Sequence, residues 1–123
     1  MPRVVHFDIA AADIVRATSF YEHAFGWKIS KAPGPLDYWL VRTGKSDEPG
    51  IDGGIALREA DWQRITMFVE VESADAAARR IVESGGSIVQ PRAVIPGVGY
   101  VVGCRDTEDN VFAIIEPDET AGF

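Results

Sequence analysis

The chain opens with a segment, VVHFDIA, in which apolar and polar side chains alternate. Alternation with a period of two is typical of a β-strand that has one face against a hydrophobic core. Val5, Phe7 and Ile9 share one face of this strand, and His6 and Asp8 share the other. We therefore expect the apolar set to pack in the core and the two polar side chains to face a cavity.

The spacing then changes to that of an amphipathic helix. Asp13 is placed to cap a helix that runs through about Phe25, and Gly26 is placed to end it. The predicted apolar stripe of this helix is Ile14, Phe20, Tyr21, Ala24 and Phe25. Three strand candidates follow, in the segments WKISKA, DYWLVRTG and GIALR. The polar stretch KSDEPGIDG is interpreted as a loop before the last of them.

The second half of the chain repeats this order of elements. ITMFVEV is a predicted strand, and Ser73 is placed to cap a helix through about Ser84. Its predicted core face is Ala74, Ala77, Ala78, Ile81 and Val82. Strand candidates follow in SIVQPRAV, YVVGCRD and NVFAIIEP, and the tail DETAGF, which has no pattern, is expected to fray.

An internal repeat explains this order. With an ungapped offset of 60 residues, His6 falls on Thr66, Asp13 on Ser73 and Gly26 on Gly86. Few residues are identical, but each strand, cap and helix stop keeps its role. We interpret the two halves as a duplication; the alternative is two similar α+β units without a common origin.

Composition and charge narrow the functional classes. A chain of 123 residues is long enough for a single domain with one modest core. The net charge of −7 argues against binding to nucleic acid or to an anionic membrane, since both need a basic surface. Cys104 is the single cysteine, and the start of the chain lacks a signal-peptide pattern, so we expect a cytoplasmic protein without disulfides.

The segments FYEHAFGW, DAAARRIVESGG and DTEDNVF, in this order, resemble the vicinal oxygen chelate superfamily. This superfamily includes glyoxalases, bleomycin-resistance proteins and extradiol dioxygenases such as the dihydroxybiphenyl enzymes. The resemblance implies an α+β fold of two tandem βαβββ modules, at about residues 3–58 and 64–117, within one domain over 1–123. It implies curved, U-shaped sheets around a cavity, helices on the outside, and a homodimer.

The resemblance also implies four positions that hold a divalent metal in metal-dependent members. On this chain they are His6, Gly53, Thr66 and Ala113. Glycine and alanine supply no side-chain donor, and one imidazole with one hydroxyl is too few for a divalent ion. We therefore predict no metal and no other cofactor.

Other residues are candidates for binding or catalysis. His6 and Asp8 can form a hydrogen-bonded pair, which is either a polar contact at the cavity wall or an acid–base pair. Trp39, Phe68 and Tyr100, together with Tyr38 beside Trp39, are candidates to line the cavity, because aromatic walls with a few polar groups suit small organic ligands. Core packing is the alternative for each of them.

Three functions fit these observations. The first is a protein that binds a small organic molecule in its cavity without metal. The second is a metal-dependent lyase, isomerase or dioxygenase, in which His6 and further ligands recruit a divalent metal. The third is a metal-free enzyme with His6 and Asp8 as acid and base. We predict the first.

Overall fold

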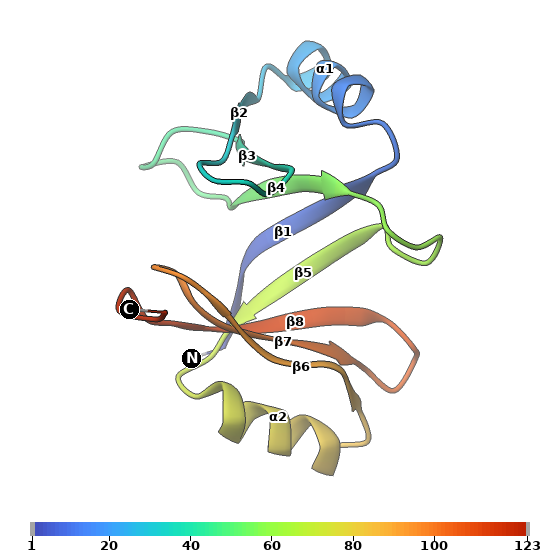
Figure 1. Cartoon of the computed structure of the whole chain (residues 1–123), viewed down its shortest axis with the longest axis vertical. Coiled ribbons are helices and arrows are strands. Elements are labelled where there is room, and N and C mark those ends of the chain that lie inside the picture. The colour runs from blue at the N-terminus through green and yellow to red at the C-terminus, as the bar shows by residue number, and fades with distance from the viewer. Residues whose placement is uncertain (1, 123) are drawn as a thin grey trace. The chain divides into compact units, whose positions relative to one another are not determined.

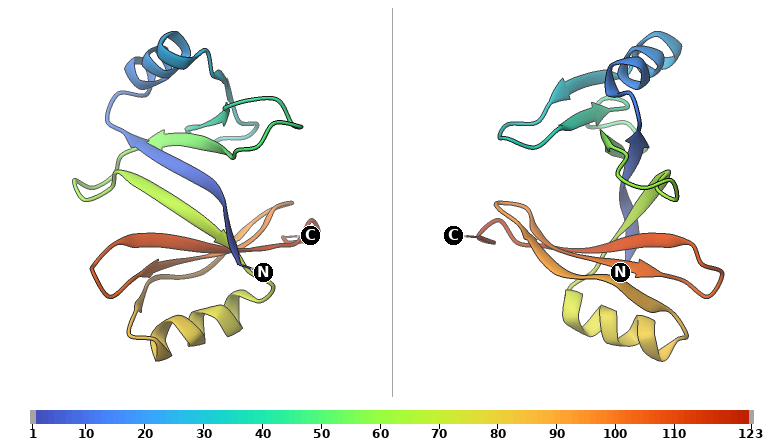
Figure 2. Two further views of the ribbon diagram at one scale, coloured as in Figure 1. Left: turned by 180° about the vertical axis from the view of Figure 1, so that it is seen from behind. Right: turned by 45° about the vertical axis from the view of Figure 1, so that its right-hand side comes forward.

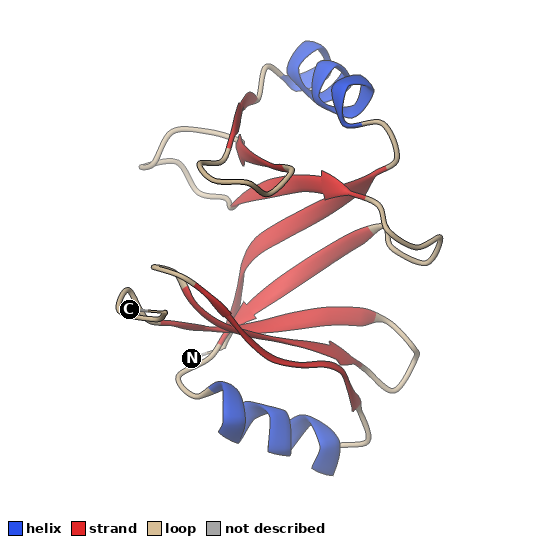
Figure 3. Ribbon diagram, viewed as in Figure 1, coloured by secondary structure: helices blue, strands red, loops and turns tan. Residues whose placement is uncertain are grey.

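The structure, a computed structural model, describes residues 2–122 and divides by contacts into two compact units. The contacts group residues 6–66 in one unit, and residues 2–5 and 67–122 in the other. By the order of elements, we call residues 2–64 the first half of the chain and residues 65–122 the second half. Both halves contain strands and one helix, so the predicted α+β class is confirmed (Figure 3). The element order within each half is the predicted βαβββ.

In the first half, four strands form a sheet with the order β2-β3-β4-β1 (Figure 1). The elements are β1 (Arg3–Ala11), α1 (Ile14–Phe25), β2 (Lys28–Lys31), β3 (Tyr38–Arg42) and β4 (Asp52–Leu57). β1 pairs with β4 in parallel, whereas the β3–β4 and β2–β3 pairs are antiparallel. The first strand of the half therefore lies beside its last strand.

The helix α1 begins and ends as the sequence predicts. The Asp13 side chain accepts a hydrogen bond from the Arg16 backbone N–H at 3.0 Å, and Gly26 takes a left-handed conformation with φ of 72°. The apolar stripe is partly different from the predicted one. The residues that pack from α1 against the core of Ala11, Val41 and Ile55 are Ile14, Ala17 and Tyr21.

Phe20 and Phe25, which were predicted for this stripe, are 59% and 63% exposed. The prediction was wrong for both because Ile14, Ala17 and Tyr21, at spacings of three and four, centre the buried stripe on another line of the helix.

The second half has the same plan. Its elements are β5 (Ile65–Glu70), α2 (Ala74–Glu83), β6 (Ser87–Ile95), β7 (Gly99–Arg105) and β8 (Val111–Pro117), with the strand order β5-β8-β7-β6. β5 pairs with β8 in parallel, and the other pairs are antiparallel. Figure 2 shows α2 along one face of the sheet of its own half.

The core of the second half consists of Ala74, Val102, Cys104 and Ile114. Ala77, Ala78 and Ile81 pack against it from α2 as predicted, while Val82 is 54% exposed. Burial raises the pKa of the Cys104 thiol, which agrees with a core role for this residue.

The tail does not fray over its described length. Ala121 is 1% exposed, and its carbonyl accepts a hydrogen bond from the Gly97 N–H at 3.0 Å. The prediction failed because a single alanine that fills a small site leaves no periodic pattern in the sequence. Within residues 2–122, no helix is long and apolar enough to cross a membrane.

Candidate functional site

The two faces of β1 divide as predicted. Ile9 packs against the core below α1, and the Phe7 ring lies 6.1 Å from the Trp27 ring. His6 and Asp8 alternate with these residues and lie opposite Asp52 and Gly54 of β4. The polar side chains therefore occupy the sheet face that α1 leaves open.

On this open face, His6, Asp8 and Tyr38 form a hydrogen-bonded triangle. The Tyr38 hydroxyl donates to Asp8 Oδ1 at 2.6 Å. His6 Nε2 lies 2.9 Å from the same Asp8 oxygen and 2.8 Å from the Tyr38 hydroxyl oxygen. Because an ionised carboxylate only accepts, this geometry assigns the hydrogen to His6 Nε2, which donates. We call these three residues the polar triad.

Tyr38 reaches the triad across the intervening strand β4. A Cβ atom at Gly54 would overlap the Tyr38 hydroxyl and ring, so only glycine leaves this path open. Gly53 is equally restricted, because a Cβ there would come within 2.6 Å of the Phe7 ring. The strand β4 begins two residues before the predicted one, because Asp52 and Gly53, which were placed in the loop KSDEPGIDG, already belong to it.

The environment of Tyr38 keeps its hydroxyl protonated. Burial raises the pKa of Tyr38 far above its usual value, and the charge of Asp8 and the hydrogen bond to it act in the same direction. Tyr38 is therefore a fixed hydrogen-bond donor to Asp8 at ordinary pH.

An open pocket of about 420 Å³ lies at the end of this sheet where β2 and β4 begin and β3 ends. His6 is part of its wall, which connects the polar triad to the pocket. The other lining residues are Glu22, Lys28, Ile29, Ser30, Leu40, Val41, Arg42, Asp52 and Gly53. The wall thus combines charged, hydroxyl and aliphatic groups.

The aromatic candidates lie in different surroundings. Trp39 packs against the core cluster below α1, on the face opposite Tyr38, and Lys31 Nζ lies 5.8 Å from its ring centroid. Tyr100 packs against the core of the second half, with the Arg92 guanidinium 4.6 Å from its ring centroid. Phe68 lies on β5 opposite Ala113. A ligand contact by these three residues stays a prediction.

The aromatic pattern marks Tyr38, beside Trp39, as a candidate to line the cavity, but not as a partner of His6 and Asp8. The signal that identifies it is the pair of glycines within β4, since a strand without side chains on one face allows a neighbouring aromatic ring to cross it.

The four positions implied for a metal do not fit one. Gly53 lies opposite Phe7, on the other face of the sheet from His6, whereas Asp52 lies opposite His6, and Gly54, opposite Asp8, is the counterpart of Ala113. Asp52 Oδ1 already accepts a hydrogen bond from the Thr43 backbone N–H at 2.8 Å. Ala113 offers no donor and is 7% exposed. Among residues 2–122, no group of three or more His, Cys, Asp or Glu side chains could hold a metal ion.

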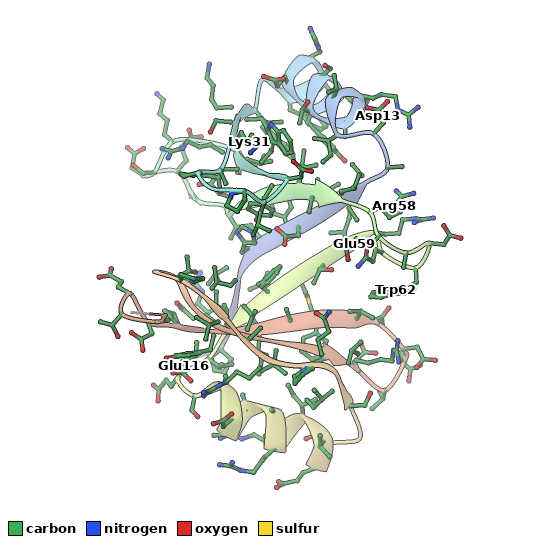
Figure 4. The ribbon with its side chains drawn as sticks, in the orientation of Figure 1. Asp13, Lys31, Arg58, Glu59, Trp62 and Glu116 are labelled. Carbon is green, nitrogen blue, oxygen red and sulfur yellow. The ribbon has the colours of Figure 1, made fainter. Side chains whose placement is uncertain are left out.

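Glu116, the acidic residue nearest this position in β8, has a structural role. Its Oε1 accepts a hydrogen bond from the Ala74 backbone N–H at 2.8 Å, at the start of α2 (Figure 4). A carboxylate at this point satisfies a free helix N–H and interacts favourably with the helix dipole. Glu116 therefore lies on the helix-covered face, as its place in the strand alternation predicts.

Comparison with known proteins agrees with this fold. A family model described as bleomycin resistance protein-like N-terminal matches residues 3–44. A search of curated proteins found no match. The chain is similar to a methylmalonyl-CoA epimerase from Mycobacterium tuberculosis, with a TM-score of 0.64, 19% identity, and coverage of 94% of this chain and 87% of that chain.

Two further solved structures have similar folds. A variant of the Streptomyces coelicolor methylmalonyl-CoA epimerase, in complex with 2-nitronate-propionyl-CoA, gives a TM-score of 0.70 with 13% identity and 98% coverage of both chains. A hypothetical protein from Bacillus halodurans gives 0.68 with 13% identity and 99% coverage of both. These matches agree with the resemblance to the vicinal oxygen chelate superfamily that the sequence motifs carry. Identities this low show the fold alone.

Proposed function

We propose that this chain binds a small organic molecule in the pocket at His6, without a metal, and that the polar triad orients the ligand. The observation that carries the proposal is the hydrogen-bonded triangle of His6, Asp8 and Tyr38, of which His6 reaches the pocket wall. The predicted homodimer and cytoplasmic location stay predictions.

The triad suits a binding role because its groups are held in place before a ligand arrives. Tyr38 and Asp8 fix the imidazole of His6, whose side chain is 31% exposed, so little conformational entropy is lost when a ligand contacts it. Leu40, also in the pocket wall, is 45% exposed and offers an apolar surface beside these polar groups. A molecule with both a polar group and an apolar body matches this wall.

Acid–base catalysis without metal is the second candidate, and the protonated state of Tyr38 favours it. A histidine between a carboxylate and a phenol can exchange a proton with a substrate, while Asp8 stabilises the imidazolium that forms. The structural neighbours named as methylmalonyl-CoA epimerases are enzymes on the same fold. If Tyr38→Phe abolishes turnover but still binds the ligand, acid–base catalysis is favoured over binding alone.

Binding can be tested with calorimetry on a ligand found by native mass spectrometry of the purified protein or, failing that, on the best binder from a panel of small alcohols, carbonyl compounds and carboxylates. Loss of a partner from a partly buried polar contact costs about 1–3 kcal/mol. His6→Ala should therefore weaken binding by roughly 5- to 150-fold. Asp8→Asn should cost less, since the amide still accepts from the imidazole.

His23 supplies the matched control. It lies on α1, is exposed, and its Nδ1 donates to the Ser19 carbonyl at 2.7 Å. His23→Ala should leave the affinity unchanged. Equal affinity of the wild-type protein and His6→Ala would contradict the proposal.

A further inference from the structure

Two cationic side chains face each other across neighbouring strands of the first half. Lys28 of β2 and Arg42 of β3 are direct partners in the antiparallel register, so their side chains lie on the same face of the sheet. Both line the pocket that contains His6. Like charges directly opposite each other in a sheet are destabilising. This pair therefore needs another reason to be present.

No acidic side chain among residues 2–122 forms an ion pair with either of them. The ion pairs of this part of the chain are His6–Asp8, Arg92–Asp75 and Arg105–Asp109. The chain has 19 acidic residues against 12 Lys and Arg, so carboxylates are plentiful. The two cations are nevertheless left to the solvent and to the pocket.

The carboxylates of the pocket are Asp52 and Glu22, which balance the two cations in formal charge. Asp52 shares the sheet face of His6, and its Oδ1 accepts from both the backbone N–H and the hydroxyl of Thr43, at 2.8 and 3.3 Å, so this oxygen is directed to Thr43 and not to the two cations. Glu22 lies on α1, not on the sheet face of Lys28 and Arg42. Lys28 and Arg42 are direct cross-strand partners, and this local pair of cations, rather than the net charge of the pocket, is the candidate site for an anion.

The same face of β3 presents three side chains in a row, Tyr38, Leu40 and Arg42. Alternate residues of a strand lie about 6.6 Å apart, so Tyr38 and Arg42 are about 13 Å apart along the backbone. Along this face of β3, the hydroxyl of Tyr38, the apolar side chain of Leu40 and the cation of Arg42 therefore follow in order. This order matches a small molecule with an apolar body and a negatively charged end.

We propose that Lys28 and Arg42 bind the anionic group, a carboxylate or a phosphate ester, of the small molecule that occupies the pocket. The guanidinium of Arg42 offers paired donors to two oxygens of such a group, and the ammonium of Lys28 adds a point charge. The inference rests on the proposed function, since it names the class of ligand for the same pocket. An organic anion is the class that this pocket selects.

Calorimetry with three probes of similar apolar body tests this inference: benzoate, phenyl phosphate and neutral benzyl alcohol. Either anion should bind more tightly than benzyl alcohol, and added salt should weaken the anions alone. A tighter benzoate indicates a carboxylate site, and a tighter phenyl phosphate indicates a phosphate site. Arg42→Gln and Lys28→Gln should each reduce the affinity for the anion by about tenfold and leave that for benzyl alcohol unchanged.

Lys31→Gln is the matched control, because Lys31 lies on the same strand as Lys28 but does not line the pocket. It should bind each probe as the wild type does. Arg42→Gln should also raise the thermal unfolding midpoint slightly, since it removes a like-charge contact.

The outcomes separate the two proposals. If benzyl alcohol binding depends on His6 but the anions bind no more tightly, the anion site is overturned and the proposed function stands. If anion binding depends on Arg42 but no probe responds to His6→Ala, the anion site stands and the role of His6 is overturned. Anion binding that Lys31→Gln weakens as much as Arg42→Gln does would indicate general surface charge and overturn the site.

Discussion

The two halves of the chain share a plan and differ in what one sheet face carries. In both, a capped helix covers one face and the first strand pairs in parallel with the last. On the other face, the first half places His6 and Asp8 where the second half has Thr66 and Phe68. The helix-covered face thus maintains the fold, and the opposite face is free to take up different chemistry.

The cores of the two halves should respond alike to truncation, and this is the largest effect that we expect. Ile55 and Ile114 are 0% and 2% exposed and each lies in the core cluster of its half. Replacing either by alanine should lower the free energy of unfolding by about 2–5 kcal/mol, because each change removes buried methyl groups and leaves a cavity. Denaturant unfolding measures this.

The two halves would prove unequal if Ile114→Ala strongly lowered the free energy of unfolding and Ile55→Ala hardly changed it. This result would show that the first half, in which no residue of α1 is fully buried, depends less on its core.

Gly54→Ala should distinguish the halves, because only the first half passes a tyrosine over its last strand. The added Cβ would overlap the Tyr38 hydroxyl, and the forced movement should cost about 1–3 kcal/mol of stability. Gly44→Ala is the control, since a Cβ there would meet Glu48 at an ordinary 3.4 Å. Unfolding in urea gives both values.

The cause can be checked in the double variant. Tyr38→Ala removes the ring that the new methyl group would strike, so Gly54→Ala should cost much less in that background. An equal cost in both backgrounds would place the strain elsewhere in β4.

Tyr38 should also give the first half a stability that falls at alkaline pH, the smallest of these effects. The raised pKa means that above the unfolded value of 10.0 the unfolded chain loses a proton that the folded protein retains. The contribution is complete below that pH and is lost as the pH rises. Between about pH 9 and pH 11, Tyr38→Phe should therefore lose less stability than the wild type.

The loss of stability of Asp8→Asn over this pH range should lie between those of the wild type and Tyr38→Phe. The substitution removes the charge and weakens the acceptor for the Tyr38 hydroxyl, but it keeps Tyr38 buried. The measurement is the free energy of unfolding across this range. Parallel curves for the wild type and Tyr38→Phe would show that Tyr38 ionises alike in both states.

The sequence was sufficient for the order of elements and insufficient for the register between strands. Asp13, Gly26 and Ser73 marked the helix ends because capping is a local interaction. Register depends on loop lengths and on contacts distant in sequence. The helix ends were therefore predicted accurately, whereas the burial of Phe20, Phe25 and Ala121, which depends on tertiary packing, was not.

The choice of Gly53 as a metal position shows how an error of one residue in register changes the face on which a residue lies. Asp8 and Phe68 are 60 positions apart, but their partners Gly54 and Ala113 are 59 apart, so one residue separates the repeats before the fourth strand. An ungapped offset therefore selected Gly53, which lies on the opposite face. The contact of Tyr38 with Asp8 was missed for a related reason, because it spans 30 residues.

The labelling rate of the single cysteine, Cys104, measures how often its surroundings open. Cys104 is 0% exposed in the second half and its thiol has a raised pKa, so a thiol reagent should reach it only when that half opens. The rate of labelling in native buffer then reports how often the second half opens. Because the first half has no cysteine, the signal belongs to the second half alone.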